Sequence, residues 1–250
     1  MIFQALFYCK DGVELKTRYG DIPEEDIAAL EYKYNWYMRY GNLPTSQRRT
    51  AEAAKADYGR QYERYVGYLF EEKGFAVNYN GLSKGLEDGG IDLVARAPRK
   101  IRLVQCKRWR MPVNVDVVSR LQGAVGRFIY EERRGKPAAT RTSIRGVIAT
   151  TGGIEAEALE LAAHFGIYVM PRLKYAMYPA IKAQRITSDG GRFLLPFTQG
   201  YDRMRLNQRA GDCFFASIRE ALANGFYYPP YHRAILNELR HKGMEPGKTC

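Results

Sequence analysis

The chain has 250 residues, of which 46% are hydrophobic, and it carries a formal net charge of +12. A chain of this length and composition forms one or two compact domains, which excludes an intrinsically disordered protein. The positive charge favours an anionic partner, either nucleic acid or an acidic membrane surface, and charge alone does not choose between them.

The four cysteines and three histidines are scattered through the chain, and no two cysteines form a CxxC pair. A structural zinc site is therefore not expected, and widely spaced single cysteines are typical of a reducing compartment. The N-terminal run MIFQALFYCKDG has no basic segment before it and is interpreted as a strand, not as a signal peptide. No stretch approaches the ~20 apolar residues that cross a bilayer, so we expect a soluble, cytoplasmic protein without a membrane partner.

Residues 1–50 are expected to form a hairpin, a helix rich in aromatic residues and a linker. An Asp-Gly pair between β-prone runs at residues 2–9 and 13–19 is typical of a hairpin. A helical pattern with acidic residues in its first turn follows from Pro23 to Tyr40. Its aromatic side chains are interpreted as a packing or dimer surface, with a platform for stacked bases as the alternative.

Residues 51–175 are expected to form an α/β domain with a mixed sheet, because strand and helix patterns alternate there. Apolar residues at spacings of three and four predict the first helix, from Ala51 to Lys73. Strands are then expected at 75–79, 91–95, 101–108, 144–150 and 166–170, helices at 115–133 and 154–165, and a glycine-rich loop at 80–90.

Residues 176–250 are expected to form a small α+β accessory module with a short helix at 218–224. Its segment DCFFASIREALANGFYYP is similar to the small modules that end many nucleases, some of which hold zinc through cysteines. Because Cys213 is alone in this segment, we expect a metal-free unit that contacts DNA or packs against another part.

The residues that carry chemistry lie on and around the stretch GLEDGGIDLVARAPRKIRLVQCKRW. Side chains alternate along a strand, so Gln105 and Lys107 point to one face and Cys106 to the other. Asp92 lies on the neighbouring strand of the same predicted hairpin. Glu63 lies on the preceding helix, off the centre of its apolar stripe, where it can reach the same edge.

Each of these residue types suits the hydrolysis of a phosphodiester. Asp92 is a hard oxygen ligand for magnesium, and Gln105 and the backbone carbonyl of Cys106 add weaker oxygen ligands. Magnesium polarises a phosphate and lowers the pKa of a bound water. Lys107 orients that water or stabilises charge in the transition state, and Glu63 holds a metal-bound water or a second ion.

Each residue taken alone also has a simpler explanation. Lys107 lies in a basic run and alternatively only contacts phosphate, whereas Gln105 and Glu63 are alternatively ordinary strand and helix residues. Asp88, in the glycine-rich loop, is either a further metal ligand or a turn residue. The combination of helix, glycine-rich loop, GGID, hairpin and QCK favours the catalytic interpretation.

The segments YERYVGYLFEEKGFAVNYNG, EDGGIDLVA and VQCKRW resemble the Mrr-like restriction endonucleases, a branch of the PD-(D/E)xK nuclease superfamily. That branch replaces the acidic residue before the catalytic lysine with glutamine, and Gln105-Cys106-Lys107 has this form. GVIATTGGIEAEALELAAHFGIYVM is similar to the next strand, threonine-rich turn, helix and strand of the family. The resemblance spans residues 56–173.

The resemblance implies a restriction-endonuclease-like sheet core flanked by helices. It also implies a catalytic core of Asp92, Gln105 and Lys107, assisted by Glu63. We therefore expect a metal-dependent endonuclease that hydrolyses double-stranded DNA, uses Mg²⁺ or Mn²⁺, and acts in type IV restriction-like defence against foreign or modified DNA. Cutting both strands requires two active sites, which predicts a homodimer at least during cleavage. A catalytically idle DNA-binding module, or a nuclease specific for junctions or damaged DNA, remains the alternative on the same fold.

Basic side chains near these motifs are the expected contacts to the DNA backbone. Some of them lie in EERRGKPAATRTSIRG, a segment longer than the usual connection in the family and alternatively an ordinary surface loop. The expected DNA contacts are Lys84, Arg99, Lys100, Arg108, Arg110, Arg133, Arg134, Lys136 and Arg141.

Overall fold

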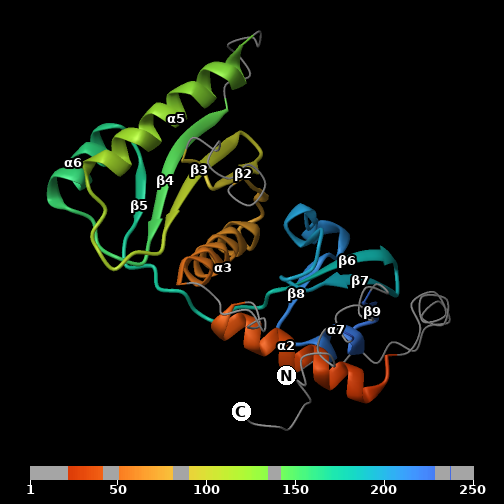
Figure 1. Ribbon diagram of the computed structural model, residues 1–250. Coiled ribbons are helices and arrows are strands. Elements are labelled where there is room, and N and C mark those ends of the chain that lie inside the picture. Colours follow the sequence, from red (N-terminus) through yellow and green to blue (C-terminus); the bar gives the residue numbers. More distant parts are fainter. Residues whose placement is uncertain (1–21, 42–50, 81–89, 135–141, 229–236, 238–250) are drawn as a thin grey trace, which may run out of the picture. The chain divides into compact units, whose positions relative to one another are not determined.

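The structure is a computed structural model of the chain, and it describes residues 22–41, 51–80, 90–134, 142–228 and 237. The chain divides into two compact units (Figure 1). The central unit is Arg49–Met177, and the split unit combines Met1–Arg48 with Tyr178–Cys250. The N-terminal hairpin and most of the linker and glycine-rich loop that the sequence predicts lie outside the described residues.

The central unit contains one five-stranded sheet with strand order β1-β2-β3-β4-β5. The first three strands pair antiparallel, and β3, β4 and β5 pair in parallel, which confirms the predicted mixed sheet. The strands are β1 (Ala76–Tyr79), β2 (Leu93–Ala97), β3 (Lys100–Lys107), β4 (Ser143–Thr150) and β5 (Tyr168–Met170).

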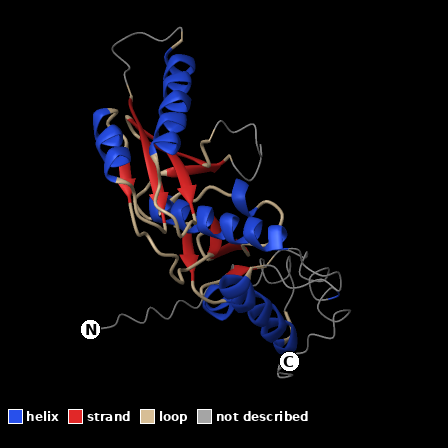
Figure 2. Cartoon of the chain, turned by 60° about the vertical axis from the view of Figure 1, so that its left-hand side comes forward, coloured by secondary structure: helices blue, strands red, loops and turns tan. Residues whose placement is uncertain are grey.

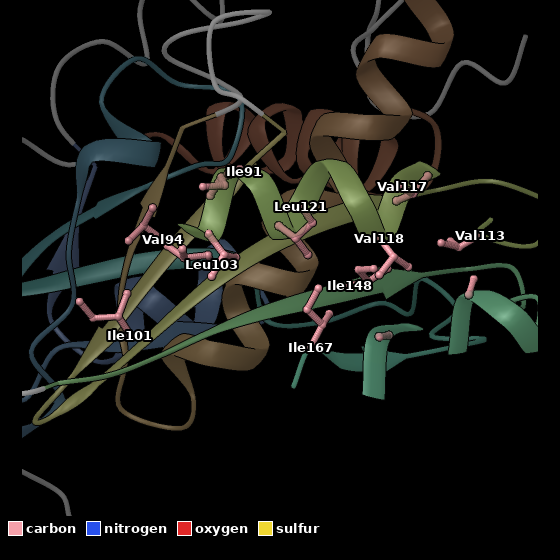
Figure 3. Packing of buried hydrophobic residues seen from close by; sticks show 14 residues of the cluster. Ile91, Val94, Ile101, Leu103, Val113, Val117, Val118, Leu121, Ile148 and Ile167 are labelled. Atoms are coloured by element: carbon pink, nitrogen blue, oxygen red, sulfur yellow. The ribbon is translucent and has the colours of Figure 1, made fainter. Parts of the chain in front are cut away.

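Helices α5 (Val115–Arg133) and α6 (Ala156–His164) connect the parallel strands and cover one face of this sheet (Figure 1, Figure 2). The side chain of Asn114 caps α5 by accepting a hydrogen bond from the backbone N–H of Val117. Apolar residues of α5 at spacings of three and four then pack on apolar residues of the strands (Figure 3). The resulting core cluster includes Leu121 from α5 and Ile101 and Leu103 from β3.

Helix α3 (Ala51–Glu71) covers the opposite face, where it packs on β1, β2 and β3. Gly67 permits the close approach of helix and sheet, because a Cβ at this position would come within 2.6 Å of the Tyr79 ring. The Tyr79 hydroxyl lies 3.2 Å from a carboxylate oxygen of Glu71 in the same helix. The sheet is therefore covered by helices on both faces, as the sequence predicts for a restriction-endonuclease-like α/β core.

The split unit contains a four-stranded sheet of order β8-β6-β7-β9. Its strands are β6 (Ile181–Thr187), β7 (Gly190–Leu194), β8 (Cys213–Phe215) and β9 (Phe226–Tyr227). Helix α2 (Glu24–Tyr40) packs on α7 (Ile218–Ala223), although the two are far apart in sequence. Two of the aromatic residues of α2 are buried in this unit: the Tyr34 hydroxyl accepts a hydrogen bond from the Ala180 N–H, and the Tyr37 ring meets Phe197 edge-on.

Helix α2 thus belongs to the same compact unit as the C-terminal strands. The sequence suggested a separate N-terminal region, since nothing in the pattern of residues 1–50 identifies the partner of this helix.

Within the described residues, no helix is long and apolar enough to cross a membrane.

Gly67→Ala is expected to destabilise the protein by about 1–3 kcal/mol, because the added methyl group overpacks the contact between α3 and Tyr79. Gly123→Ala is the matched control: this glycine lies in the exposed middle of α5 with nothing within 4 Å of the added Cβ. The control is expected to stabilise the protein by about 0.5–1 kcal/mol, since alanine is the better helix former. Urea unfolding measures both, and equal effects would contradict the packing argument.

Candidate active site

The two antiparallel strands β2 and β3 bring Asp92 to the centre of the sheet. Leu93, the first residue of β2, pairs with Val104, and Asp92, just before β2, also donates its backbone N–H to the carbonyl of Val104 at 2.9 Å. Its side chain then turns toward β3, where Oδ2 accepts a hydrogen bond from the backbone N–H of Cys106 at 2.6 Å. The carboxylate of Asp92 is therefore fixed against the strand that carries the QCK motif.

Gln105 and Lys107 lie on the same face of β3 as Ile101 and Leu103, the face covered by α5. Gln105 is buried, and within the described residues its Oε1 atom accepts no hydrogen bond. Lys107 is half-buried at the end of the strand. A buried amide oxygen without a donor costs free energy, and a bound cation is one group that would offset this cost.

Gly90 packs against the amide of Gln105. Its φ of +84° is in the left-handed region that favours glycine, and a Cβ there would lie 3.2 Å from Nε2 of Gln105. The second glycine of the GGID sequence therefore provides both the turn into β2 and the space that Gln105 occupies.

Cys106 points to the opposite face of the sheet, toward α3. Burial raises the pKa of its thiol well above the ordinary value, the charges of Asp92 and Glu63 raise it further, and Lys107 lowers it. These charges act on one thiol because Asp92, Glu63 and Lys107 all lie near it. The thiol stays neutral near pH 7, so Cys106 offers a metal ion its backbone carbonyl and not a thiolate.

Glu63 joins this group from α3, and its Oε2 atom is buried. Glu63, Asp92 and Lys107 thus all lie near Cys106, and Gln105 precedes Cys106 on β3, while Asp88 lies outside the described residues. Within the described residues, no three His, Cys, Asp or Glu side chains lie close enough together to hold a metal ion. Any site here would be built from two carboxylates, an amide oxygen and a backbone carbonyl, and oxygen donors suit a hard cation.

The loop after β3 is held in place by the turn after β4. The Thr151 N–H donates to the carbonyl of Lys107 at 3.0 Å, and the Thr151 hydroxyl donates to the carbonyl of Trp109 at 2.8 Å. A Cβ on Gly152 would come within 2.6 Å of the Met111 carbonyl oxygen, so this turn packs directly on the loop. The residues that follow QCK are therefore held in a defined conformation.

A cavity of about 980 Å³ opens beside this loop, with Lys107 in its wall. Its cationic lining residues are Lys107, Arg108, Arg110 and Lys174, and its aromatic ones are Tyr58, Trp109 and Tyr175. The Lys107 ammonium lies 4.9 Å from the centre of the Trp109 ring. The Arg108 guanidinium lies 4.7 Å from the centre of the Tyr58 ring and 5.3 Å from that of Tyr175.

Local sequence patterns do not identify the three aromatic residues or Lys174 as part of this site. Tyr58 is one of the residues whose spacing predicts the helix from Ala51 to Lys73, and nothing near Lys174 and Tyr175 in sequence connects them with the QCK motif. Trp109 lies two residues after Lys107, the last residue of QCK, and this position is the one sequence feature that identifies it.

The expected DNA contacts divide between two ends of the sheet. Arg108 and Arg110 line the cavity, whereas Arg99 and Lys100 lie at the other end of β3, about 23 Å away for a strand of this length. Arg133 and Arg134 lie at this other end too, because the ion pair between Arg96 and Glu132 fixes the end of α5 beside β2. The remaining three predicted contacts, Lys84, Lys136 and Arg141, lie outside the described residues.

Comparison with known proteins places the central unit in a family. Residues 53–174 match the model of the Mrr catalytic domain, described as a restriction endonuclease. None of the curated proteins matches the chain. Among solved structures, the chain is similar to one described as the crystal structure of a protein of unknown function, AF1548, at 24% identity and a TM-score of 0.32. That likeness covers 43% of this chain and 54% of the other, so the chain spans about half of that protein's length.

The family match covers the helix, the hairpin and both parallel strands that surround the Asp92, Gln105 and Lys107 group. Residues 53–174 of this chain are thus a nuclease domain of the restriction-endonuclease type, and they belong to the Mrr family.

Proposed function

We propose that the protein is a divalent-metal-dependent endonuclease that hydrolyses phosphodiester bonds in double-stranded DNA. The observation that supports this most directly is the geometry of the hairpin. Asp92 is hydrogen-bonded to the backbone of the QCK strand, and Gln105, on the same strand, has a buried Oε1 atom that accepts no hydrogen bond within the described residues. The charge of +12 suits a polyanionic substrate.

The residues present fit a hard divalent cation, because each donor is an oxygen atom and Oε1 of Gln105 has no other partner within the described residues. Asp92, Gln105 and the backbone carbonyl of Cys106 would hold the ion, and Glu63 would hold a second ion or a bound water. Restriction-endonuclease-like nucleases generally use divalent metals, and we propose Mg²⁺, with Mn²⁺ as a substitute. Such an ion polarises the scissile phosphate and lowers the pKa of a water.

Individual side chains of the site have separate roles in the proposed hydrolysis. Lys107 holds the attacking water in line or stabilises charge that develops on the phosphate oxygens. Asp92 fixes the geometry by bridging to β3, and its negative charge balances the cation and Lys107. Burial on the opposite face keeps Cys106 neutral, so its thiol adds no charge to the group.

The biological role that we propose is type IV restriction-like defence against foreign or modified DNA, carried out in the cytoplasm. It rests on the match of the central unit to the Mrr catalytic domain. Cutting both strands requires two active sites, so we propose a homodimer at least during cleavage.

Lys107→Ala is expected to lower the rate of plasmid cleavage by at least about a hundredfold, because it removes charge stabilisation at the scissile phosphate. The assay uses supercoiled plasmid, methylated and unmethylated, with Mg²⁺, Mn²⁺ or EDTA. Lys73→Ala, which removes an exposed lysine at the end of α3, is the control and should cleave like the wild type. Wild type that leaves every DNA intact with both metals would contradict the proposed function.

Asp92→Asn and Gln105→Ala are each expected to weaken Mn²⁺ binding by at least about tenfold, because each removes an oxygen ligand or its charge. Asparagine can still accept the hydrogen bond from Cys106, so the first variant tests the charge and not the fold. Isothermal titration of the DNA-free protein gives the affinities, with Glu131→Gln, an exposed residue near the end of α5, as the control. Unchanged Mn²⁺ affinity in both variants would show that these residues do not hold the ion.

Gly90→Ala is expected to slow cleavage because its methyl group displaces the amide of Gln105. Gly74→Ala is the matched control: its φ of +78° imposes the same backbone strain, but nothing lies within 4 Å of the added Cβ. Both variants should lose about 1 kcal/mol of stability, and only Gly90→Ala should lose cleavage at a temperature where both are folded. Equal cleavage by the two variants would show that the contact between Gly90 and Gln105 does not support the site.

A further inference from the structure

The cavity beside Lys107 differs from a surface that contacts only a DNA backbone. Phosphates in a duplex lie on the outside, while the base faces are stacked and out of reach. A surface for phosphates alone therefore needs cations and hydrogen-bond donors, and it gains nothing from exposed apolar side chains. This cavity, however, exposes two large apolar side chains among its cations, since Trp109 is 42% exposed and Met111 is 72% exposed.

The fold holds Trp109 and Met111 in exposed positions. The hydrogen bonds from Thr151 to the carbonyls of Lys107 and Trp109 hold the loop at both ends of Arg108, and the Val113 N–H donates to the Gly153 carbonyl. The backbone at Trp109 and Met111 is thus fixed by the turn after β4, and these side chains are held at the cavity.

The charged groups of the cavity are arranged for a phosphate beside a base. The Arg108 guanidinium is held over the rings of Tyr58 and Tyr175, and its Nη1 atom donates to the Tyr58 carbonyl at 3.0 Å. Its other N–H groups make no hydrogen bond within the described residues, and none of the described residues that line the cavity is acidic. Arg108 therefore presents fixed donors, while the Trp109 ring, with Lys107 at 4.9 Å, presents an aromatic surface.

From this arrangement the geometry points to a binding site for an unstacked nucleotide of the DNA strand that is cut. Its base stacks on Trp109 beside Met111, and its phosphate meets Arg108 next to Lys107. Cationic grooves with aromatic surfaces are the usual means of binding single-stranded nucleic acid. The volume of about 980 Å³ is large enough for a nucleotide. The inference rests on the proposed function, and it narrows the substrate to DNA that is unpaired, or becomes unpaired, at the scissile phosphate.

The test compares the affinity of the protein for two DNA duplexes in EDTA, where binding does not depend on a metal or on cleavage. One duplex is fully paired, and the other has the same sequence with a single unpaired nucleotide, 5-iododeoxyuridine. We expect the wild type to bind the second duplex about tenfold more tightly, the gain from one stacked base. Photo-crosslinking followed by mass spectrometry should attach the unpaired nucleotide to Trp109.

Trp109→Ala should abolish this preference and leave the affinity for paired DNA unchanged, whereas Trp109→Phe should keep most of it. Tyr130→Ala removes an aromatic side chain of α5 that is 69% exposed, and this matched control should alter neither affinity. Met111→Ala serves as a second variant, because this residue is largely exposed and its loss leaves the core intact. It should reduce the preference even if Trp109→Ala fails to fold.

Equal affinity of the wild type for both duplexes, or an equal loss for both in Trp109→Ala, would overturn the inference. The proposed function is tested separately. Metal-dependent cleavage of paired DNA, without a binding preference for the unpaired nucleotide, would support the nuclease and contradict the nucleotide site. A binding preference that depends on Trp109, without cleavage in Mg²⁺ or Mn²⁺, would support the nucleotide site and contradict the nuclease.

Discussion

The pairing of β2 with β3 is the constraint on which the rest of the site depends. A hydrogen bond from the Cys106 N–H to the side chain of Asp92, just before the paired residues of β2, fixes a carboxylate beside a strand that carries an amide and an ammonium group. Strand alternation then separates these groups from Cys106, whose half-buried thiol remains neutral on the opposite face. One short hairpin therefore determines the charge, the orientation and the spacing of the candidate active site.

The packing around the hairpin keeps it in place from both faces. On one face, Ile101 and Leu103 pack beneath α5, and on the other α3 approaches closely at Gly67. Because the parallel pairing of β3 with β4 runs to Lys107 and Thr150, the turn after β4 lies next to the loop after QCK. The same architecture that supports the candidate ligands thus also forms the wall of the adjacent cavity.

The two ends of the central sheet carry different surfaces. The cavity at the end of β3 combines cations with exposed apolar side chains. The other end of the sheet carries cations such as Arg99 and Arg133. Cations at both ends suit a long polyanion, and exposed apolar side chains lie at only one of these two ends within the described residues that line the cavity. This division follows from the direction of β3 and α5, which run between the two ends.

The sequence alone determined the α/β core, the bounds of α5, and the strand that carries Gln105 and Lys107, because hydrophobic period and strand alternation are local properties. Several features required the tertiary structure. Tyr58, Trp109, Lys174 and Tyr175 meet at one cavity only because α3, the loop after β3 and the segment after β5 converge there. Likewise, α2 joins the C-terminal strands through contacts between residues far apart in the chain. Local patterns specify which face of an element is apolar, but the partner of that face is chosen by the packing of the whole chain.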